Sequence, residues 1–138
     1  MRFGQLAKIF QEWGWEIKHE HYVAFSDYLK EMLKRRRVIV IMRDNNIEAI
    51  FTYYLTDDFN KIYKKRTWDV VDDDQNGHQI YIDKMIAKNV NIRTIRTIQD
   101  FIEENFPNVD IGIYHRAPFD KCVRIHRRKI HELQNSVS

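Results

Sequence analysis

The segment Gly77–His115, GHQIYIDKMIAKNVNIRTIRTIQDFIEENFPNVDIGIYH, decides the fold that this sequence predicts. It opens with an apolar, β-branched run as far as Ala87 and continues with helical periodicity to Asn105. It closes with a second strand pattern over Asp110–His115. A strand, a helix and a strand in this order usually form a crossover whose strands lie parallel. The sequence therefore predicts two parallel strands with a helix on one face of their sheet.

The turn between the first strand and the helix, Lys88–Arg93, contains no glycine. Turns at this position often bind phosphate, because the helix that follows begins with N–H groups that lack partners inside the helix. Glycine usually occurs there since it lets a phosphate approach the backbone closely. The segment thus offers a scaffold for a binding site without the residue that most often makes one.

Two helices and a hairpin are predicted before this segment. The spacing of apolar residues indicates a helix ending near Gly14 and a second helix over Tyr22–Arg36. Two β-branched runs, Val38–Met42 and Ile47–Leu55, flank the turn-forming segment Arg43–Asn46. Asparagine tolerates positive φ, so this pattern predicts an antiparallel hairpin.

The predicted elements make one α/β (α+β) domain. A last amphipathic strand is expected from Cys122 to Ile130, so the domain covers residues 1–130 and residues 131–138 form a frayed tail. The expected sheet is mixed, with the antiparallel hairpin beside the strand–helix–strand unit and helices on both faces. Ile82, Ile98 and Ile113 are expected to share one core between the sheet and a helix.

Composition restricts the class of protein. An apolar content of 43% excludes a disordered chain, and a net charge of +3 is well below that of a histone-like protein. A single cysteine, Cys122, excludes an internal disulfide and indicates a reducing, cytoplasmic compartment. No apolar run approaches the roughly 18 residues that span a bilayer, so no membrane association is expected. The abundance of isoleucine, asparagine and lysine is typical of an AT-rich genome, such as that of a phage.

The order of elements over Leu6–Arg128 resembles the GCN5-related N-acetyltransferase (GNAT) fold. The resemblance implies that the strand ending at Ala87 splays from its neighbour Asp110–His115, and that acetyl-CoA or another acyl-CoA lies in the cleft. It also implies that the turn Val90–Thr94 holds the pyrophosphate. The implied cofactor-binding residues are Met85 and Ala87 through their backbone, with Arg93, Thr94 and Arg96 at the phosphates.

The same resemblance implies acyl transfer to an amine or hydroxyl acceptor. Such a reaction needs a base that removes a proton from the acceptor and an acid that protonates the leaving thiolate. Asp83 is the candidate base, and Tyr114 or His115 is the candidate acid. A simpler alternative is that Asp83 and Lys84 are ordinary exposed residues of a strand.

Two other classes of function remain open. The family pattern has small residues at two positions that Asn89–Arg96 lacks, which favours a non-catalytic structural or assembly protein on a transferase-like scaffold. Nucleic acid or another polyanion could bind through Arg124, Arg127 and Arg128, with further basic clusters at Arg35–Arg37 and Lys64–Arg66.

No metal site is expected from the sequence. The six histidines form no recognisable ligand set, and Asp72–Asp74 is interpreted as part of a solvated loop. Cys122 begins an apolar strand, so it is interpreted as a small core residue. The oligomeric state is not predicted.

Overall fold

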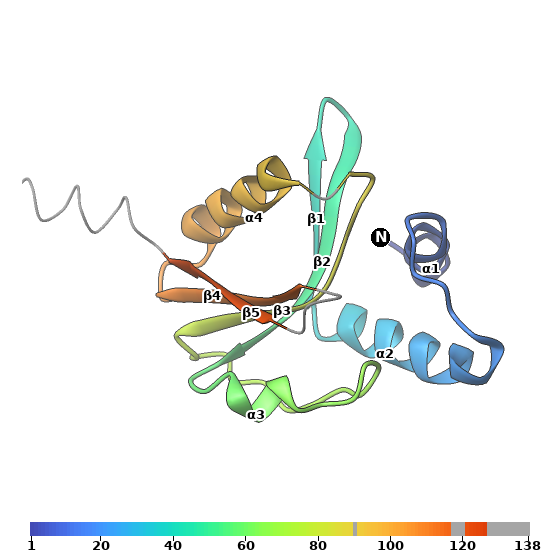
Figure 1. Cartoon of the computed structure of the whole chain (residues 1–138), viewed down its shortest axis with the longest axis horizontal. Helices are drawn as coiled ribbons and strands as arrows, with labels where there is room; N and C mark the ends of the chain where they lie inside the picture. Colours follow the sequence, from blue (N-terminus) through green and yellow to red (C-terminus); the bar gives the residue numbers. More distant parts are fainter. Residues whose placement is uncertain (90, 117–120, 127–138) are drawn as a thin grey trace, which may run out of the picture.

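The computed structural model of the chain describes residues 1–89, 91–116 and 121–126 (Figure 1). The predicted domain end at residue 130 and the predicted tail, residues 131–138, lie outside the described residues. The elements are α1 (Phe3–Glu12), a 3-10 turn (His19–His21), α2 (Tyr22–Lys34), β1 (Val38–Arg43), β2 (Asn46–Thr56), α3 (Asn60–Tyr63), β3 (Gln79–Ala87), α4 (Ile92–Asn105), β4 (Ile111–Arg116) and β5 (Lys121–His126).

The strands form one five-stranded sheet in the order β1-β2-β3-β4-β5. β2 pairs antiparallel with both β1 and β3, and β5 pairs antiparallel with β4. β3 and β4 run parallel because α4 carries the chain back across the sheet between them. The predicted mixed sheet, with a hairpin beside a strand–helix–strand unit, is therefore confirmed.

The hairpin turn has the backbone that its sequence predicts. Asp44 and Asn45 both have positive φ, at 51° and 64°. Two consecutive residues with positive φ match the right-handed twist of the flanking strands, and Asp and Asn tolerate this conformation better than most residues. A third non-glycine residue with positive φ, Arg36 at 59°, follows the end of α2. Helix α2 therefore ends at Lys34, two residues before the predicted Arg36.

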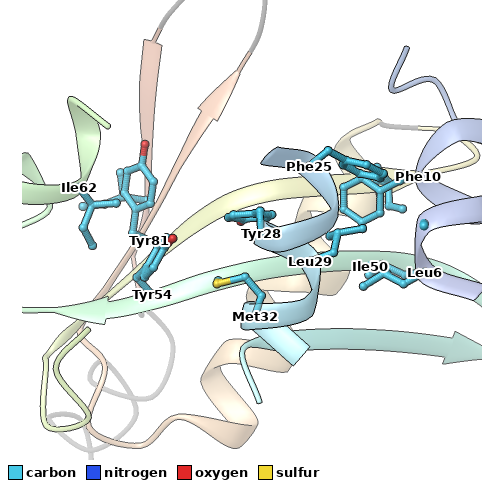
Figure 2. Close-up of a cluster of buried hydrophobic side chains, with 13 residues drawn as sticks. Leu6, Phe10, Phe25, Tyr28, Leu29, Met32, Ile50, Tyr54, Ile62 and Tyr81 are labelled. Atoms are coloured by element: carbon cyan, nitrogen blue, oxygen red, sulfur yellow. The ribbon is translucent and has the colours of Figure 1, made fainter. Parts of the chain in front are cut away.

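Helices cover both faces of the sheet, as predicted (Figure 1). On one face, side chains of α1 and α2 point onto β2 and β3 and form a largely aromatic and aliphatic core (Figure 2). On the other face, α4 packs Ile98 and Ile102 against the sheet. The two cores are separated by the sheet, because successive side chains of a strand point to opposite faces.

One expectation about the core is wrong. Ile82 and Ile98 belong to the core beneath α4, but Ile113 belongs to the core beneath α1 and α2. The sequence does not show which face of an interior strand meets which helix, because β4 is apolar on both faces. All three side chains are nevertheless buried.

A conservative truncation at Ile98 tests the core beneath α4. Ile98→Val should lower the free energy of unfolding by about 1 kcal/mol, since the buried methyl group leaves a small cavity. Ile92→Val on the same helix is the matched control, because Ile92 is 69% exposed and should change stability by less than about 0.5 kcal/mol. Denaturant titration measures both. Equal losses for the two variants would contradict the assigned buried face of α4.

Candidate functional site

A β-bulge in the middle of β3 shapes the candidate site. Thr52 pairs with Lys84 and Tyr53 pairs with Ile82, so Asp83 has no partner of its own on β2. Tyr81 and Ile86 both belong to the core beneath α1 and α2, although one is odd-numbered and the other even-numbered. The bulge therefore shifts the alternation of side chains by one residue. As a result both Asp83 and Lys84 point toward α2.

Four side chains meet at this bulge and are named here the buried charge cluster: Tyr28, Lys65, Asp83 and Lys84. The Tyr28 hydroxyl donates to the Asp83 carboxylate at 2.5 Å, and its oxygen lies 2.6 Å from Thr52 Oγ1. The Asp83 carboxylate also lies 2.9 Å from Lys65 Nζ and 3.3 Å from Lys84 Nζ. Only 4% of the Lys65 side chain, 5% of Asp83 and 6% of Lys84 is exposed.

This burial corrects two expectations. The alternative that Asp83 and Lys84 are ordinary exposed strand residues is wrong, because the bulge turns both inward. Lys65 is likewise not an exposed cation available to a polyanion. The segment that follows α3 folds back over the sheet, and the position of a side chain in such an irregular segment follows from tertiary contacts alone.

The two lysines have different surroundings. Besides Asp83, Lys65 Nζ donates to three backbone carbonyls, those of Arg66, Thr67 and Asp69, at 2.9–3.1 Å. Lys84 Nζ has Asp83 as its oxygen partner. Its remaining neighbours include the rings of Trp15, Tyr28 and Trp68, whose centroids lie 5.2–5.7 Å away.

Burial changes the protonation chemistry of the cluster. Desolvation lowers the pKa of Lys84 to about 8; the charge of Lys65 acts in the same direction, and the attraction of Asp83 opposes it. Desolvation, and then the neighbouring Asp83 charge, raises the pKa of Tyr28 well above its ordinary value. Tyr28 therefore acts as a hydrogen-bond donor at neutral pH, while Lys84 loses its proton only slightly above it.

A second feature is a surface groove of about 360 Å³ beside the start of α4. Residues from the β1–β2 turn and from the turn after β3 line it: Arg43, Asp44, Asn46, Ile47, Glu48, Lys88, Asn89, Asn91, Arg93 and Thr94. Arg43 is paired with Glu48 at 3.3 Å, whereas Lys88 and Arg93 are exposed. The groove combines these cations with the positive end of the α4 dipole, which favours an anion.

The start of α4 is held by a capping box. The Asn91 side chain accepts from the Thr94 amide, and the Thr94 hydroxyl donates to the Asn89 carbonyl at 2.8 Å. Thr94 is buried, so its side chain holds the turn. A ligand at this helix end would have to use the amides of Ile92 and Arg93 instead.

The predicted cofactor-binding residues do not all meet in the groove. Arg93 and Thr94 line it, while Arg96 is exposed one turn along α4 and is not among the lining residues. Met85 and Ala87 lie on β3, where they pair with Phe51 and Ala49 of β2. Val90, the first residue of the predicted phosphate turn, lies outside the described residues.

β3 and β4 separate beyond the middle of β3. Their described pairing runs from Gln79 opposite Ile111 to Ile82 opposite Tyr114, and β3 continues to Ala87 paired with β2. β4 continues instead with β5. From Asp83 to Ala87, β3 therefore has no pairing with β4 among the described residues.

The predicted base and acid lie on opposite faces of the sheet. Asp83 points toward α2 and bonds Tyr28, whereas Tyr114 is buried in the core beneath α4. Strand alternation separates them, because Tyr114 pairs with Ile82, the residue before Asp83. The side chain of His115, the other candidate acid, lies outside the described part of the chain.

The basic segments proposed for polyanion binding are partly used within the fold. Arg35 pairs with Glu31 at 2.9 Å and Arg37 pairs with Asp73 at 2.5 Å, where Asp73 also accepts from the Leu55 amide. Asp73 is thus part of a largely buried ion pair. Arg124 belongs to β5, and Arg127 and Arg128 lie outside the described residues. Nucleic-acid binding through these three arginines stays a prediction.

Sequence reasoning missed two members of the cluster. Tyr28 lies three residues after Phe25 and four before Met32, so its place on the buried stripe of α2 was readable from the helical period. Lys65 carried no such signal, because it lies in a basic run next to a short helix. Its burial follows from the packing of residues 64–78 over β2 and β3.

No known family model matches this chain, and no curated protein matches it. Within the described residues, no group of three or more histidine, cysteine, aspartate or glutamate side chains is placed to hold a metal ion. In the same part of the chain, no helix has the length and apolar character needed to cross a membrane.

Proposed function

We propose that the chain binds an acyl-CoA and transfers its acyl group to an amine or hydroxyl, as expected of a GNAT-like protein. The carrying observation is that the described pairing of β3 with β4 ends at Ile82, while β3 continues to Ala87. An open strand edge can pair with the amide groups of an extended ligand such as pantetheine. The groove at the start of α4 follows directly after this edge.

Charge supports placing the phosphates in the groove. Lys88 and Arg93 are exposed cations there, and the helix dipole of α4 adds partial positive charge. The exposed Ile92 stands beside them at the first position of the helix, where a glycine would let a phosphate come closer. We therefore expect weak binding in which side-chain charge carries much of the affinity.

The acceptor side of the proposed reaction lies at the β-bulge. Asp83 is the proposed proton acceptor, but its carboxylate already accepts from Tyr28, Lys65 and Lys84. A substrate amine or hydroxyl would have to displace one of these donors. Tyr114 lies on the other face, so a proton for the leaving thiolate would come from elsewhere, for example from water.

Calorimetry with acetyl-CoA tests this proposal. Arg93→Ala together with Arg96→Ala should weaken binding at least about tenfold, since a hydrogen bond to a charged group contributes about 1.5–3 kcal/mol. Arg96→Ala alone is the matched control, because Arg96 is not among the groove residues and should have the smaller effect. Pantetheine, which lacks the phosphates, should bind equally to all variants. No heat and no thermal shift at millimolar acetyl-CoA would overturn the proposal.

A further inference from the structure

Two lysines share one carboxylate in the buried charge cluster. With Lys65, Lys84 and Asp83 all ionised, the cluster carries a net charge of +1 while no more than 6% of each side chain is exposed. Burial disfavours an uncompensated charge, because the protein interior solvates it poorly. Loss of one proton from one lysine makes the cluster neutral.

The contacts decide which lysine gives up its proton. Lys65 Nζ has four oxygen atoms within 3.1 Å, from Asp83 and three backbone carbonyls, which is more than its three N–H groups require. Lys84 Nζ has one oxygen partner at 3.3 Å and is otherwise faced by aromatic rings. Aromatic faces stabilise a cation less than direct oxygen acceptors do. Lys84 is therefore the lysine that loses its proton more readily.

We infer that Lys84 is a nucleophile that forms a Schiff base with a small aldehyde or ketone. The lone pair of Nζ attacks the carbonyl carbon as the C=O π bond breaks, and a proton passes from nitrogen to oxygen to give a carbinolamine. Loss of water then forms the C=N bond. The products are an imine and one water molecule, and no atom is oxidised or reduced. Lysines are activated for this reaction by desolvation or by a neighbouring cation, and Lys84 has both.

The side chains around Lys84 restrict the size and polarity of the carbonyl compound that can react. The titratable groups that face it are Tyr28 from α2, Lys65 from the segment after α3, and Asp83 beside it on β3. Trp15 and Trp68 complete the shell, and both are only partly buried, whereas 6% of the Lys84 side chain is exposed. A compound that enters between these rings is small and mainly apolar. This inference needs no acyl-CoA and goes beyond the proposed function.

Reductive alkylation of the unmodified, folded chain tests the inference. Acetaldehyde with cyanoborohydride at pH 7 converts the imine into an ethyl-lysine, which peptide mass spectrometry locates. With a pKa of about 8 in place of 10.5, Lys84 holds about 300-fold more neutral amine at this pH than an ordinary lysine. We expect Lys84 to react at least tenfold faster than Lys8, which is 75% exposed in its side chain. A rate no faster than that of Lys8 would overturn the inference.

A second measurement follows the protonation of Lys84 directly. In the unmodified chain with ¹³C-labelled lysine, the Lys84 Cε resonance should titrate near pH 8, and its assignment follows from its loss in Lys84→Arg. A midpoint above pH 10 would contradict the inference. Lys65→Met, which removes the neighbouring cation, should slow ethylation of Lys84 severalfold. An unchanged or faster rate in the folded Lys65→Met variant would count against activation by that cation.

Discussion

Asp83→Asn is expected to lower the free energy of unfolding by about 3–5 kcal/mol at neutral pH. The substitution keeps the size of the side chain but removes the negative charge that faces Lys65 and Lys84. Two buried ammonium groups then repel each other with no compensating carboxylate. The Tyr28 hydroxyl also loses its charged acceptor. Urea titration followed by circular dichroism measures the loss.

An exposed aspartate supplies the matched control. Asp100→Asn on α4 changes the formal charge of the chain equally, but Asp100 is exposed, so its effect should stay within about 0.5 kcal/mol. Adding Lys84→Met to Asp83→Asn should recover part of the loss, since the second buried cation disappears. If the two aspartate variants had equal stability, the buried charge cluster would contribute nothing as an ion pair. Strictly additive effects of Asp83→Asn and Lys84→Met would show that the pair does not interact.

Stability should increase by about 2 kcal/mol between pH 8 and pH 10 through Lys84 alone. The folded chain releases the Lys84 proton near pH 8, whereas the unfolded chain keeps it up to about pH 10.5. Between these values the unfolded state binds more protons, so a rise in pH favours the folded state. Above pH 10, Tyr28 and Tyr54 make the free energy of unfolding fall as the pH rises. Burial raises their pKa values in the folded chain, so they ionise more easily when the chain unfolds.

The Lys84→Met variant isolates this contribution. Its free energy of unfolding should lack the increase from pH 8 to pH 10, while all other titrating groups remain the same. Denaturant titrations of both chains at four or five pH values give the difference directly. Parallel stability curves for the two chains would mean that Lys84 titrates at its ordinary pKa in the folded state.

The proposed acyl-CoA site and the Lys84 amine use neighbouring parts of β3. The bulge turns Asp83 and Lys84 toward α2. The described pairing of β3 with β4 ends at Ile82, the residue before the bulge. Bulges often occur next to active sites, because they redirect side chains and interrupt pairing. Here β3 stays paired with β2 as far as Ala87, and the groove at α4 is lined by residues that follow it, beginning at Lys88. The proposed acyl-CoA site and the reactive amine are therefore close along the chain but use different atoms.

Much of the fold could be predicted from the sequence. The hairpin followed from two β-branched runs around the turn Arg43–Asn46, and the parallel pair followed from the helical period between Ala87 and Asp110. These signals are local, because a turn residue or a periodic spacing acts within a few positions of the chain. It was harder to predict which buried side chains pack in the same core, as the placement of Ile113 on the α2 face of the sheet shows.

The sequence by itself determined the order of the main elements and the mixed sheet that they form. It also indicated Asp83 as a residue of interest on the central strand. Only the tertiary structure decided that Asp83 is buried with two lysines and a tyrosine, since one extra residue in β3 reverses which side chains face α2. The partners come from a helix 55 residues away and from an irregular segment. No local pattern specifies such contacts, because they arise when packing brings distant segments together and water is excluded from between them.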